Sequence, residues 1–375
     1  MDIDLVYAWV DGNDLEWQKE KHSWELMNKQ APAAAMNQCR FLDNQELKYS
    51  LRSVFVNAPW INKIYIITNG QTPKWLNINH PKIKIINHKD IMPEDALPTF
   101  NSEAIECCIP NIEGLSEHFI YSNDDFFINK PIEKNFFFNE NGEPIIRLVP
   151  QKWKERNYIK NLYCHNINYS IELIKSKFNK EYNYEICHNM DAYRKSYFYE
   201  CEKEFQKEFN KTKHAKFREK NSVQRIIVSL YTLAKNNGEL RICKMRSKHF
   251  HIETAYIALS DRKRMRKRIK TNNPSLFCIN DNERAKYIYR KNLSIFLESL
   301  FPIRAPWEND LGILKMPIKT NNVQHKFKYI THYLKIYLKY KIYKLLSVIT
   351  NGKIRTRNIG QCEYFREKIR IIRDL

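Results

Sequence analysis

The sequence contains few glycines and no long apolar run. Only 8 of its 375 residues are glycine, and it has neither a GxGxxG loop nor a Walker phosphate-binding loop. Nowhere do about 18 apolar residues follow one another, so no membrane-spanning helix is predicted. The first residues, MDIDLVYAWVDGND, lack the basic region and cleavage site of a signal peptide. These absences exclude the common dinucleotide-binding and P-loop classes, and we expect a cytoplasmic protein.

Cysteine pairs with metal-binding or disulfide spacing are also missing. The nine cysteines are odd in number and scattered, and no CxxC pair occurs. Cys164 and Cys187 each precede a histidine, but their spacing fits no usual zinc site. The pattern therefore indicates a reducing compartment rather than a disulfide framework or a zinc ribbon.

Positive charge and aromatic residues are abundant. Hydrophobic residues make up 43% of the chain and aromatic residues 13%, which predicts a folded protein with a sizeable core. The net charge of +21, from 63 Lys+Arg against 42 Asp+Glu, implies an anionic partner. Nucleic acid, an acidic membrane surface and phosphorylated substrates would all suit this charge. We expect no nucleic-acid partner, because no RNP, KH, zinc-finger or helix-turn-helix signature is present.

Short apolar runs that end in polar residues predict an α/β fold. The runs cover residues 3–10, 63–68, 83–86 and 118–121, and an amphipathic helix is expected within 40–56, capped by Asp43 or Asn44. Strands that are separated by helical or loop stretches and end in polar residues suggest an α/β domain. We therefore predict a Rossmann-like, mostly parallel sheet whose ligand lies at the carboxyl ends of the strands.

After about residue 150 the sequence becomes rich in Lys, Glu, Tyr and Asn, with helical patterns. We predict an α/β core over 1–150, a mainly helical subdomain over 151–270, a return to the core over 271–320 and a basic helical tail over 321–375. Within the subdomain, helices are expected at 191–209 and 222–235. The tail could dock on an anionic inner-membrane face, which would make the protein peripheral, or it could be a packed helix with a solvated lysine face.

Two acidic dipeptides follow apolar runs. Asp124 and Asp125 end the stretch HFIYSNDD, and Asn280 and Asp281 end LFCIND. Such residues often form ordinary turns. Adjacent carboxylates are costly to bury, however, unless a cation or hydrogen bonds compensate them. With isolated His and Arg residues elsewhere, the pattern fits chemistry on a phosphate, in which Asp oxygens hold a divalent cation, Arg clamps the phosphate and His handles a proton.

Several longer blocks resemble one known family. They include IDLVYAWVDGND (3–14), RFLDNQELKYSLRSV (40–54), APWINKIYIITNGQTPKWLN (58–77), HKDIMPEDALPTFNSEAIE (88–106), GLSEHFIYSNDDFFINKP (114–131), EFNKTKHAKFR (208–218) and LFCINDN (276–282). In this order the blocks resemble the Stealth family of sugar-1-phosphate transferases from about residue 3 to residue 302. That family includes bacterial capsular polysaccharide phosphotransferases and the animal N-acetylglucosamine-1-phosphotransferase.

The resemblance implies a reaction. A hexose- or hexosamine-1-phosphate would pass from a UDP-sugar to a hydroxyl of an oligosaccharide or polysaccharide acceptor, with release of UMP and with Mg²⁺ or Mn²⁺ as cofactor. Residues 1–150 would bind the nucleotide sugar, 151–270 would form the acceptor side, and the tail would meet the membrane or a capsule assembly complex. The alternatives are a metal-dependent glycosyltransferase that releases UDP, and a catalytically silent scaffold.

The resemblance also implies site residues. The catalytic residues would be Asp11, His188 and Arg218, and the metal-binding residues Asp124, Asp125, Asn280 and Asp281. The substrate-binding residues would be Arg40, Asn44, Glu46, Arg52, Asn101, Ser102, Asn166 and Asn168. Each could instead be structural: a lone histidine is usually a core or surface residue, and buried asparagines often satisfy backbone groups. One departure is that Asn189-Met190-Asp191 follows His188 where the family usually has a proline.

Overall fold

The computed structural model describes residues 1–150, 162–182, 184–247, 250–251, 253–261, 269 and 271–309. Residues 1–307 form one compact unit. The predicted basic tail over 321–375 lies outside the described residues. The division of the rest into a core, a helical subdomain and a return segment stays a prediction.

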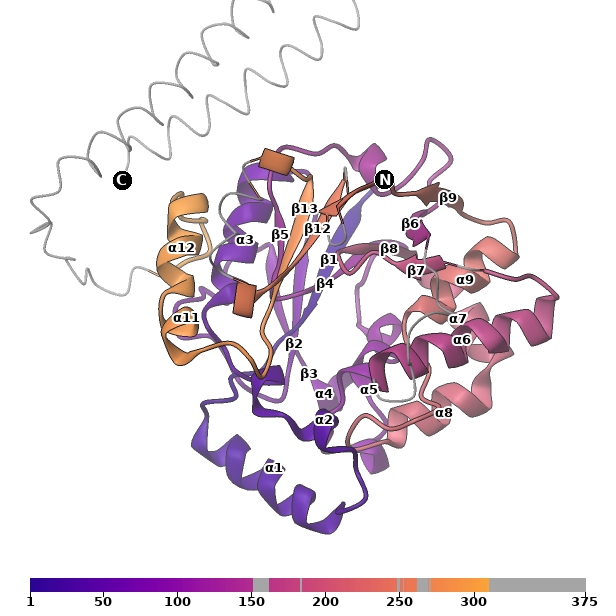
Figure 1. The fold of residues 1–375 in the computed structure, drawn as a ribbon, viewed down its shortest axis with the longest axis horizontal. Coiled ribbons are helices and arrows are strands. Elements are labelled where there is room, and N and C mark those ends of the chain that lie inside the picture. The colour runs from indigo at the N-terminus through magenta and orange to yellow at the C-terminus, as the bar shows by residue number, and fades with distance from the viewer. Residues whose placement is uncertain are drawn as a thin grey trace, which may run out of the picture. The chain divides into compact units, whose positions relative to one another are not determined.

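A central five-stranded sheet carries the fold (Figure 1). Its strands run in the order β3 (Ile83–Asn87), β2 (Ile64–Thr68), β1 (Ile3–Ala8), β4 (His118–Asn123) and β8 (Asp191–Arg194). The first four strands are parallel, whereas β8 pairs with β4 in antiparallel orientation. The prediction of a mostly parallel α/β sheet is confirmed.

Both faces of β1, β2 and β4 are largely buried, which explains why these strands are mostly apolar. Because side chains alternate along a strand, Leu5 packs on the side of α3 (Glu46–Asn57), and Val6 packs on the side of α6 (Leu162–Phe178) and α9 (Ile226–Ala234). Figure 1 shows the helices on both sides of the strands. The strands can therefore be almost uninterrupted in apolar residues.

The predicted cap of α3 is wrong. The helix begins at Glu46, and its N-cap is Gln45 in a left-handed conformation with φ 70° and no side-chain capping bond. Asp43 instead accepts a hydrogen bond from the Gln45 backbone nitrogen at 2.8 Å, and Asn44 donates to Glu46 from its backbone and its side chain. Asp43 is thus held in the loop before α3, and Glu46 is the first residue of the helix.

The predicted helix at 191–209 is also wrong at its start. Residues 191–194 form β8, and two helices follow, α7 (Lys195–Glu204) and α8 (Gln206–His214). Pairing with β4 takes precedence over local helix propensity, because it provides hydrogen-bond partners for the backbone groups on the outer edge of β4. The helix predicted at 222–235 is confirmed as α9.

A second five-stranded sheet and a three-stranded sheet complete the described part of the chain. One runs β10 (Met245–Ser247), β11 (Phe250–His251), β12 (Thr254–Ala258), β13 (Leu276–Asn280) and β5 (Phe126–Ile128); the other runs β7 (Tyr184–Ile186), β6 (Ile145–Pro150) and β9 (Glu239–Ile242). The remaining α-helices are α1 (Leu15–Met27), α2 (Ala33–Met36), α4 (His88–Ile91), α5 (Ser102–Glu106), α11 (Tyr287–Lys291) and α12 (Leu293–Leu300). Asp124 and Asp125 form the turn between β4 and β5, where the chain leaves one sheet for the next.

The loop after β1 touches the loop before α3 at Gly12. The Gly12 nitrogen donates to the Phe41 oxygen at 2.8 Å, and a Cβ at residue 12 would lie 2.0 Å from that oxygen. No larger residue fits here without moving the backbone. Glycine therefore lets Asp11 approach the acidic loop that carries Asp43.

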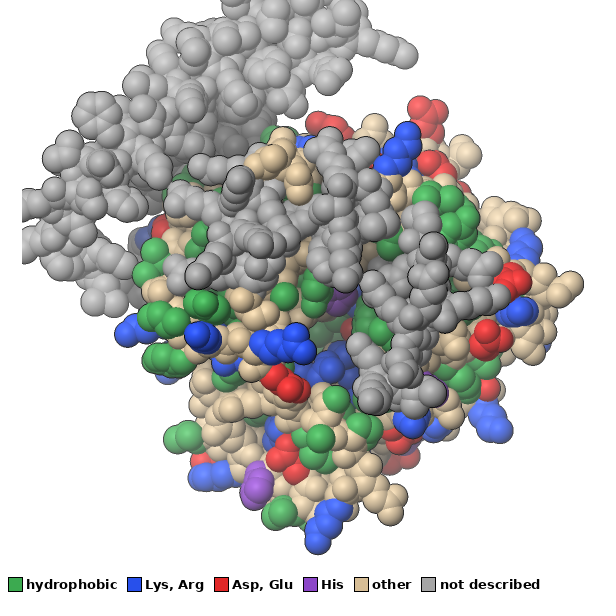
Figure 2. All heavy atoms as spheres, in the orientation of Figure 1, with side chains coloured by type: hydrophobic (Ala, Val, Ile, Leu, Met, Phe, Trp, Pro, Cys, Tyr) green, Lys and Arg blue, Asp and Glu red, His purple; other side chains and the backbone are tan. Residues whose placement is uncertain are grey.

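Basic side chains lie at several separate places on the face drawn in Figure 2, among acidic and hydrophobic ones. Within the described ranges, no helix has both the length and the apolar character needed to cross a bilayer.

Candidate active site

The candidate site lies at the carboxyl ends of β1 and β4. Asp124 and Asp125 follow β4, and the backbone oxygen of Asp125 accepts a hydrogen bond from Ile279 of β13 at 3.0 Å. The loop with His188 precedes β8, which lies beside β4. Segments far apart in the sequence therefore converge on the turn between β4 and β5.

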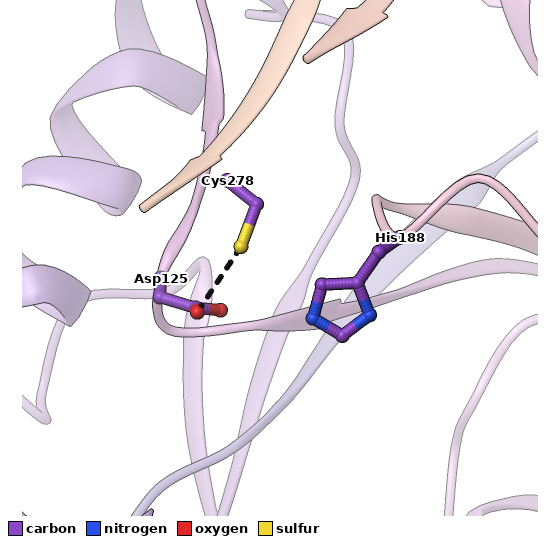
Figure 3. Close-up of side chains that lie close together, drawn as sticks. All are labelled: Asp125, His188 and Cys278. Carbon is purple, nitrogen blue, oxygen red and sulfur yellow. Dashed lines mark hydrogen bonds between the residues drawn. The ribbon is translucent and has the colours of Figure 1, made fainter. Parts of the chain in front are cut away.

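Three side chains at this turn could together hold a cation. One ligand atom from each of Asp125, His188 and Cys278 lies within 4.8 Å of the others (Figure 3). The Cys278 thiol donates to Asp125 Oδ2 at 3.2 Å, whereas the buried Asp125 Oδ1 has no hydrogen-bond partner in the described part of the chain. A buried acceptor without a donor is costly, so this oxygen is suited to a ligand.

The carboxyl groups around the turn repel one another. Burial raises the pKa of Asp125 to about 6, and burial with the neighbouring Asp125 raises the pKa of Asp124 well above its ordinary value. Burial also raises the pKa of Glu46, with added repulsion from Asp124 and Asp43, and raises the pKa of Asp43 to about 6. A bound cation would favour the ionised form of this acidic cluster, which consists of Asp43, Glu46, Asp124 and Asp125.

Three aromatic side chains surround the ring of His188. Its ring centroid is 5.1 Å from that of Phe126, 5.6 Å from that of Tyr256 and 5.9 Å from that of Tyr163. Burial of the ring lowers the pKa of His188 to about 3, and the positive charges of Arg225 and Arg218 add to this effect. The imidazole is thus neutral near pH 7, and a bound anion that offsets the two arginine charges would make it a better proton acceptor.

Arg40 and Arg218 lie within electrostatic range of each other, and Arg218 also acts on His188. Arg218 donates to the Ser102 hydroxyl and lies 3.9 Å from Glu103, and Arg40 donates to the Ala34 oxygen at 2.6 Å. Arg40 reaches solvent, yet the surrounding protein atoms and the like charge of Arg218 lower its pKa to about 10. An anion between the two guanidinium groups would relieve this repulsion, and phosphate oxygens suit that geometry.

Buried polar residues support Arg218. Asn101 caps α5 by accepting from the Glu103 nitrogen at 3.1 Å and donates to the Ala215 oxygen at 3.2 Å. Asn166 donates to Glu103 Oε2 at 3.0 Å, while its own Oδ1 has no partner among the described residues. These contacts fix the position of α5 relative to the segment that ends at Arg218.

Two further predicted residues lie beside the acidic cluster. Asn280 accepts from the Tyr256 hydroxyl at 3.1 Å, and its side chain also interacts with Asp125. Asp11 lies within electrostatic range of Asp43, and its backbone is clamped by Gln71, which accepts at 2.9 Å and donates at 3.1 Å. The metal-binding role of Asn280 and the catalytic role of Asp11 stay predictions.

Three predicted residues are not brought into the cluster. Asp281 forms two hydrogen bonds with Arg290, at 2.7 and 3.0 Å. Arg52 is 3% exposed and binds Glu298 at 2.8 Å, which joins α3 to α12. Asn168 lies on an exposed position of α6. Their predicted binding roles stay predictions.

Sequence reasoning missed Cys278 and Arg225. Cys278 precedes Asn280 by two residues in β13, so strand periodicity alone could have placed both side chains on one face. Arg225 donates to Asp191 at 2.9 Å, lies 3.6 Å from Glu106 and acts electrostatically on His188. Nothing in the local sequence distinguishes it from a solvated arginine.

Asn189, the first residue of the segment that departs from the family pattern after His188, is buried. Asn189 is 1% exposed, and neither its side-chain oxygen nor its side-chain nitrogen has a partner within the described residues. An amide in this state is suited to contact a ligand.

Comparisons with known proteins identify the family. Conserved regions 1, 2 and 3 of the Stealth proteins match residues 1–29, 40–146 and 188–232. The capsular polysaccharide phosphotransferase fcs1 of Haemophilus influenzae is 33% identical over 80% of this chain and 84% of its own length. The exopolysaccharide phosphotransferase cps2G of Lactiplantibacillus plantarum is 31% identical over 82% and 96%.

Another relative is longer than this chain. The capsular polysaccharide phosphotransferase SacB of Neisseria meningitidis serogroup A is 34% identical over 82% of this chain but only 57% of its own length. The solved structure of the galactosyltransferase LgtC with donor and acceptor sugar analogs has a TM-score of 0.39 at 9% identity, covering 80% of this chain and 96% of LgtC, too distant for inference. The matched regions and the identity to fcs1 confirm the resemblance inferred from sequence blocks: the chain belongs to the Stealth family.

Proposed function

We propose that this chain transfers a hexose- or hexosamine-1-phosphate from a UDP-sugar to a saccharide hydroxyl, with release of UMP, in capsular polysaccharide synthesis. Relatives named as capsular or exopolysaccharide phosphotransferases support the reaction class. The observation that supports the proposal is that His188 lies next to Asp125 of the acidic cluster and within electrostatic range of Arg218, which in turn acts on Arg40.

The acidic cluster fits a divalent cation. Asp125 has a buried oxygen without a partner, and burial favours the protonated forms of Asp124 and Asp125. Carboxylate oxygens are the ligands that Mg²⁺ and Mn²⁺ prefer, so these two residues would hold the ion, with Asn280 beside them. Such an ion supplies positive charge to the phosphate oxygens.

The protein groups divide the remaining work. His188 accepts the proton of the acceptor hydroxyl, whose oxygen forms a new bond to the β-phosphorus of the donor. The bond from this phosphorus to the oxygen shared with UMP breaks, and UMP leaves with the electron pair. Arg218 and Arg40 bind the phosphate oxygens. Catalysis of this kind depends mostly on positioning and charge stabilisation.

The other predicted partners are part of the proposal. Residues 1–150 would bind the donor and 151–270 the acceptor, and the tail would attach the protein to an anionic inner-membrane face or to a capsule assembly complex. The net charge of +21 supports attraction to acidic surfaces and to a polyanionic product.

The released nucleotide tests the proposed reaction. We expect the purified chain, incubated with UDP-hexoses and UDP-hexosamines, Mg²⁺ and short capsule-type acceptors, to release UMP and to form a phosphodiester. Because Arg218 would bind phosphate oxygens, Arg218→Ala should lower kcat/KM by about 10²-fold or more, and Arg218→Lys by less. Chromatography of the nucleotides measures both effects. Release of UDP would instead indicate glycosyl transfer and overturn the proposal.

A further inference from the structure

Asp125, His188 and Cys278 offer three different kinds of metal-binding atom. One carboxylate oxygen, one ring nitrogen and one sulfur lie within 4.8 Å of one another. Among the described residues, no other group of three or more His, Cys, Asp and Glu side chains is this close together. Oxygen, nitrogen and sulfur atoms together are typical ligands of Zn²⁺, whereas Mg²⁺ binds oxygen atoms. A Mg²⁺ ion at Asp125 therefore does not explain why a thiol belongs to this group.

Backbone pairing fixes the thiol beside the carboxylate. Cys278 in β13 pairs with Phe126 in β5, and the Ile279 nitrogen donates to the Asp125 oxygen at 3.0 Å. The ring of His188 meets the ring of Phe126 edge to face, with 5.1 Å between the centroids. The three metal-binding side chains are thus held next to one another by a strand pair and by a packed aromatic ring. Such support is what a metal site needs, because its ligands must be in place before the ion binds.

The spacing of the ligand atoms is close to that of a tetrahedral zinc site. Zinc bonds of about 2.3 Å to sulfur and about 2.0–2.2 Å to nitrogen or oxygen place the ligand atoms roughly 3.3–3.7 Å apart. The Cys278 sulfur already lies 3.2 Å from Asp125 Oδ2. The imidazole of His188 faces the same carboxylate (Figure 3). Since all three atoms lie within 4.8 Å of one another, small rotations of His188 or Asp125 complete the site.

An ion can reach the thiol through the carboxylate. Asp125 and His188 are partly exposed, whereas Cys278 is fully buried behind them. The thiol proton is donated to Asp125 Oδ2, so an ion that takes the place of this proton is bonded to both the sulfur and the oxygen. Zn²⁺ displaces thiol protons in this way, because a thiol that binds it is deprotonated. Mg²⁺ does not bind sulfur and leaves the thiol as a hydrogen-bond donor.

We propose that Asp125, His188 and Cys278 bind Zn²⁺ and that this binding inhibits the enzyme. The sulfur, one carboxylate oxygen and one ring nitrogen bind the ion, and the thiol proton is released to solvent. His188 can then no longer accept the proton of the acceptor hydroxyl, and Asp125 is no longer available to Mg²⁺. The inhibition rests on the proposed function, whereas the zinc site itself does not.

Metal binding is measured first, on the untagged full chain without substrate. Titration with Zn²⁺ against a competing zinc indicator should show one tight site that Mg²⁺ does not fill. Co²⁺ bound at the same site should give a cobalt–thiolate charge-transfer band in the near ultraviolet, and Zn²⁺ should abolish this band. Cys278→Ser keeps a hydroxyl donor for Asp125 but no thiolate, so the band should be lost. Its zinc affinity should fall by about 10²-fold or more, since even residues outside the direct ligands change metal affinity by about 10–100-fold.

The control is a cysteine that is equally buried but lies elsewhere. Cys201 in α7 is 0% exposed, like Cys278, and Cys201→Ser should keep both the cobalt band and the zinc affinity of the unsubstituted chain. In the transfer assay with Mg²⁺, Zn²⁺ should inhibit the unsubstituted chain and Cys201→Ser, and EDTA followed by Mg²⁺ should restore their activity. Cys278→Ser, compared with its own zinc-free rate, should need about 10²-fold more Zn²⁺ for the same inhibition.

The outcomes separate the zinc site from its effect on the reaction. Absence of the cobalt–thiolate band in the unsubstituted chain would overturn the site, and this result requires no variant to fold. Equal zinc affinity, or equal inhibition, in Cys278→Ser and the unsubstituted chain would show that Zn²⁺ only replaces Mg²⁺ and would also overturn it. Tight zinc binding with full activity would overturn the inhibition. UMP release by the zinc-free chain tests the proposed function separately.

Discussion

Replacing Asp125 with asparagine is expected to lower turnover on the order of 10³-fold while leaving Tm unchanged or higher. Asp125 lies at the centre of the candidate site, with one oxygen bound by the Cys278 thiol and the other without a partner. An amide of the same shape cannot supply the negative charge that holds a cation. It also removes a buried carboxyl group whose ionised form is disfavoured by burial.

The pH dependence of stability provides a second readout for Asp125→Asn. The pKa of Asp125 is raised from 3.8 to about 6 in the folded protein, so the folded state binds this proton more tightly than the unfolded state does. The stability from this group is present below the unfolded pKa and is lost as pH rises through the folded pKa. In metal-free buffer, the free energy of unfolding of the variant should therefore exceed that of the unsubstituted chain increasingly from about pH 4 to about pH 7.

Cation binding distinguishes the loss of a metal ligand at Asp125 from a general effect of removing a carboxylate. Mg²⁺ or Mn²⁺ should raise the Tm of the unsubstituted chain and of Asp95→Asn, since Asp95 has a side chain 79% exposed. Asp125→Asn should show little or no rise. Normal turnover in Asp125→Asn, or an equal rise of Tm in all three proteins, would contradict the assignment of this carboxylate.

Replacing His188 with alanine is expected to lower kcat by about 10²- to 10⁴-fold, with a much smaller change in the KM for the donor. The reason is that His188 would accept the proton of the acceptor hydroxyl. Steady-state kinetics with varied donor at saturating acceptor measures both constants. His165→Ala is the matched control, because His165 binds Asn221 on the surface at 3.0 Å. Equal losses in the two variants, or a wild-type kcat in His188→Ala, would contradict the role.

The pH dependence of activity should be that of an enzyme whose His188 stays neutral. Because burial and two arginines lower the pKa of His188 to about 3, its ring stays neutral well below its ordinary pKa of 6.5. At subsaturating Mg²⁺, activity should fall on the acid side near pH 6, where protons compete with the cation for Asp125. An acid limb that persists unchanged in Asp125→Asn with residual activity would point to another group.

The strands of the central sheet could be predicted from sequence because both of their faces are buried. That burial makes β1, β2 and β4 continuous apolar runs that stop where polar loops begin. The strand β8 could not be predicted, since four residues at a sheet edge resemble the start of the helix that follows. Its structure depends on pairing with β4, which is a tertiary contact.

In the site, too, some features follow from the local sequence and others depend on contacts between residues far apart in the chain. The acidic dipeptide at 124–125 and its place at a strand end follow from the sequence. The contact between Asp125 and Cys278 spans 153 positions, and it exists because β13 pairs with β5. Likewise, the pKa of His188 depends on Arg225, whose burial no local pattern reveals. Single-sequence patterns identify strand ends, whereas the sheet pairing determines which of them meet.

The most direct test of sugar-1-phosphate transfer follows one oxygen atom. The donor is a UDP-sugar that carries ¹⁸O at the oxygen between the sugar C1 and the β-phosphorus. It is incubated with the chain, Mg²⁺ and acceptor. The masses of the nucleotide and saccharide products are then measured by mass spectrometry. If the bond broken lies within the pyrophosphate, UMP is unlabelled and the label appears in the phosphodiester of the product. Label retained in released UDP, with none in the saccharide, would show that the sugar C1–O bond breaks instead and would contradict sugar-1-phosphate transfer.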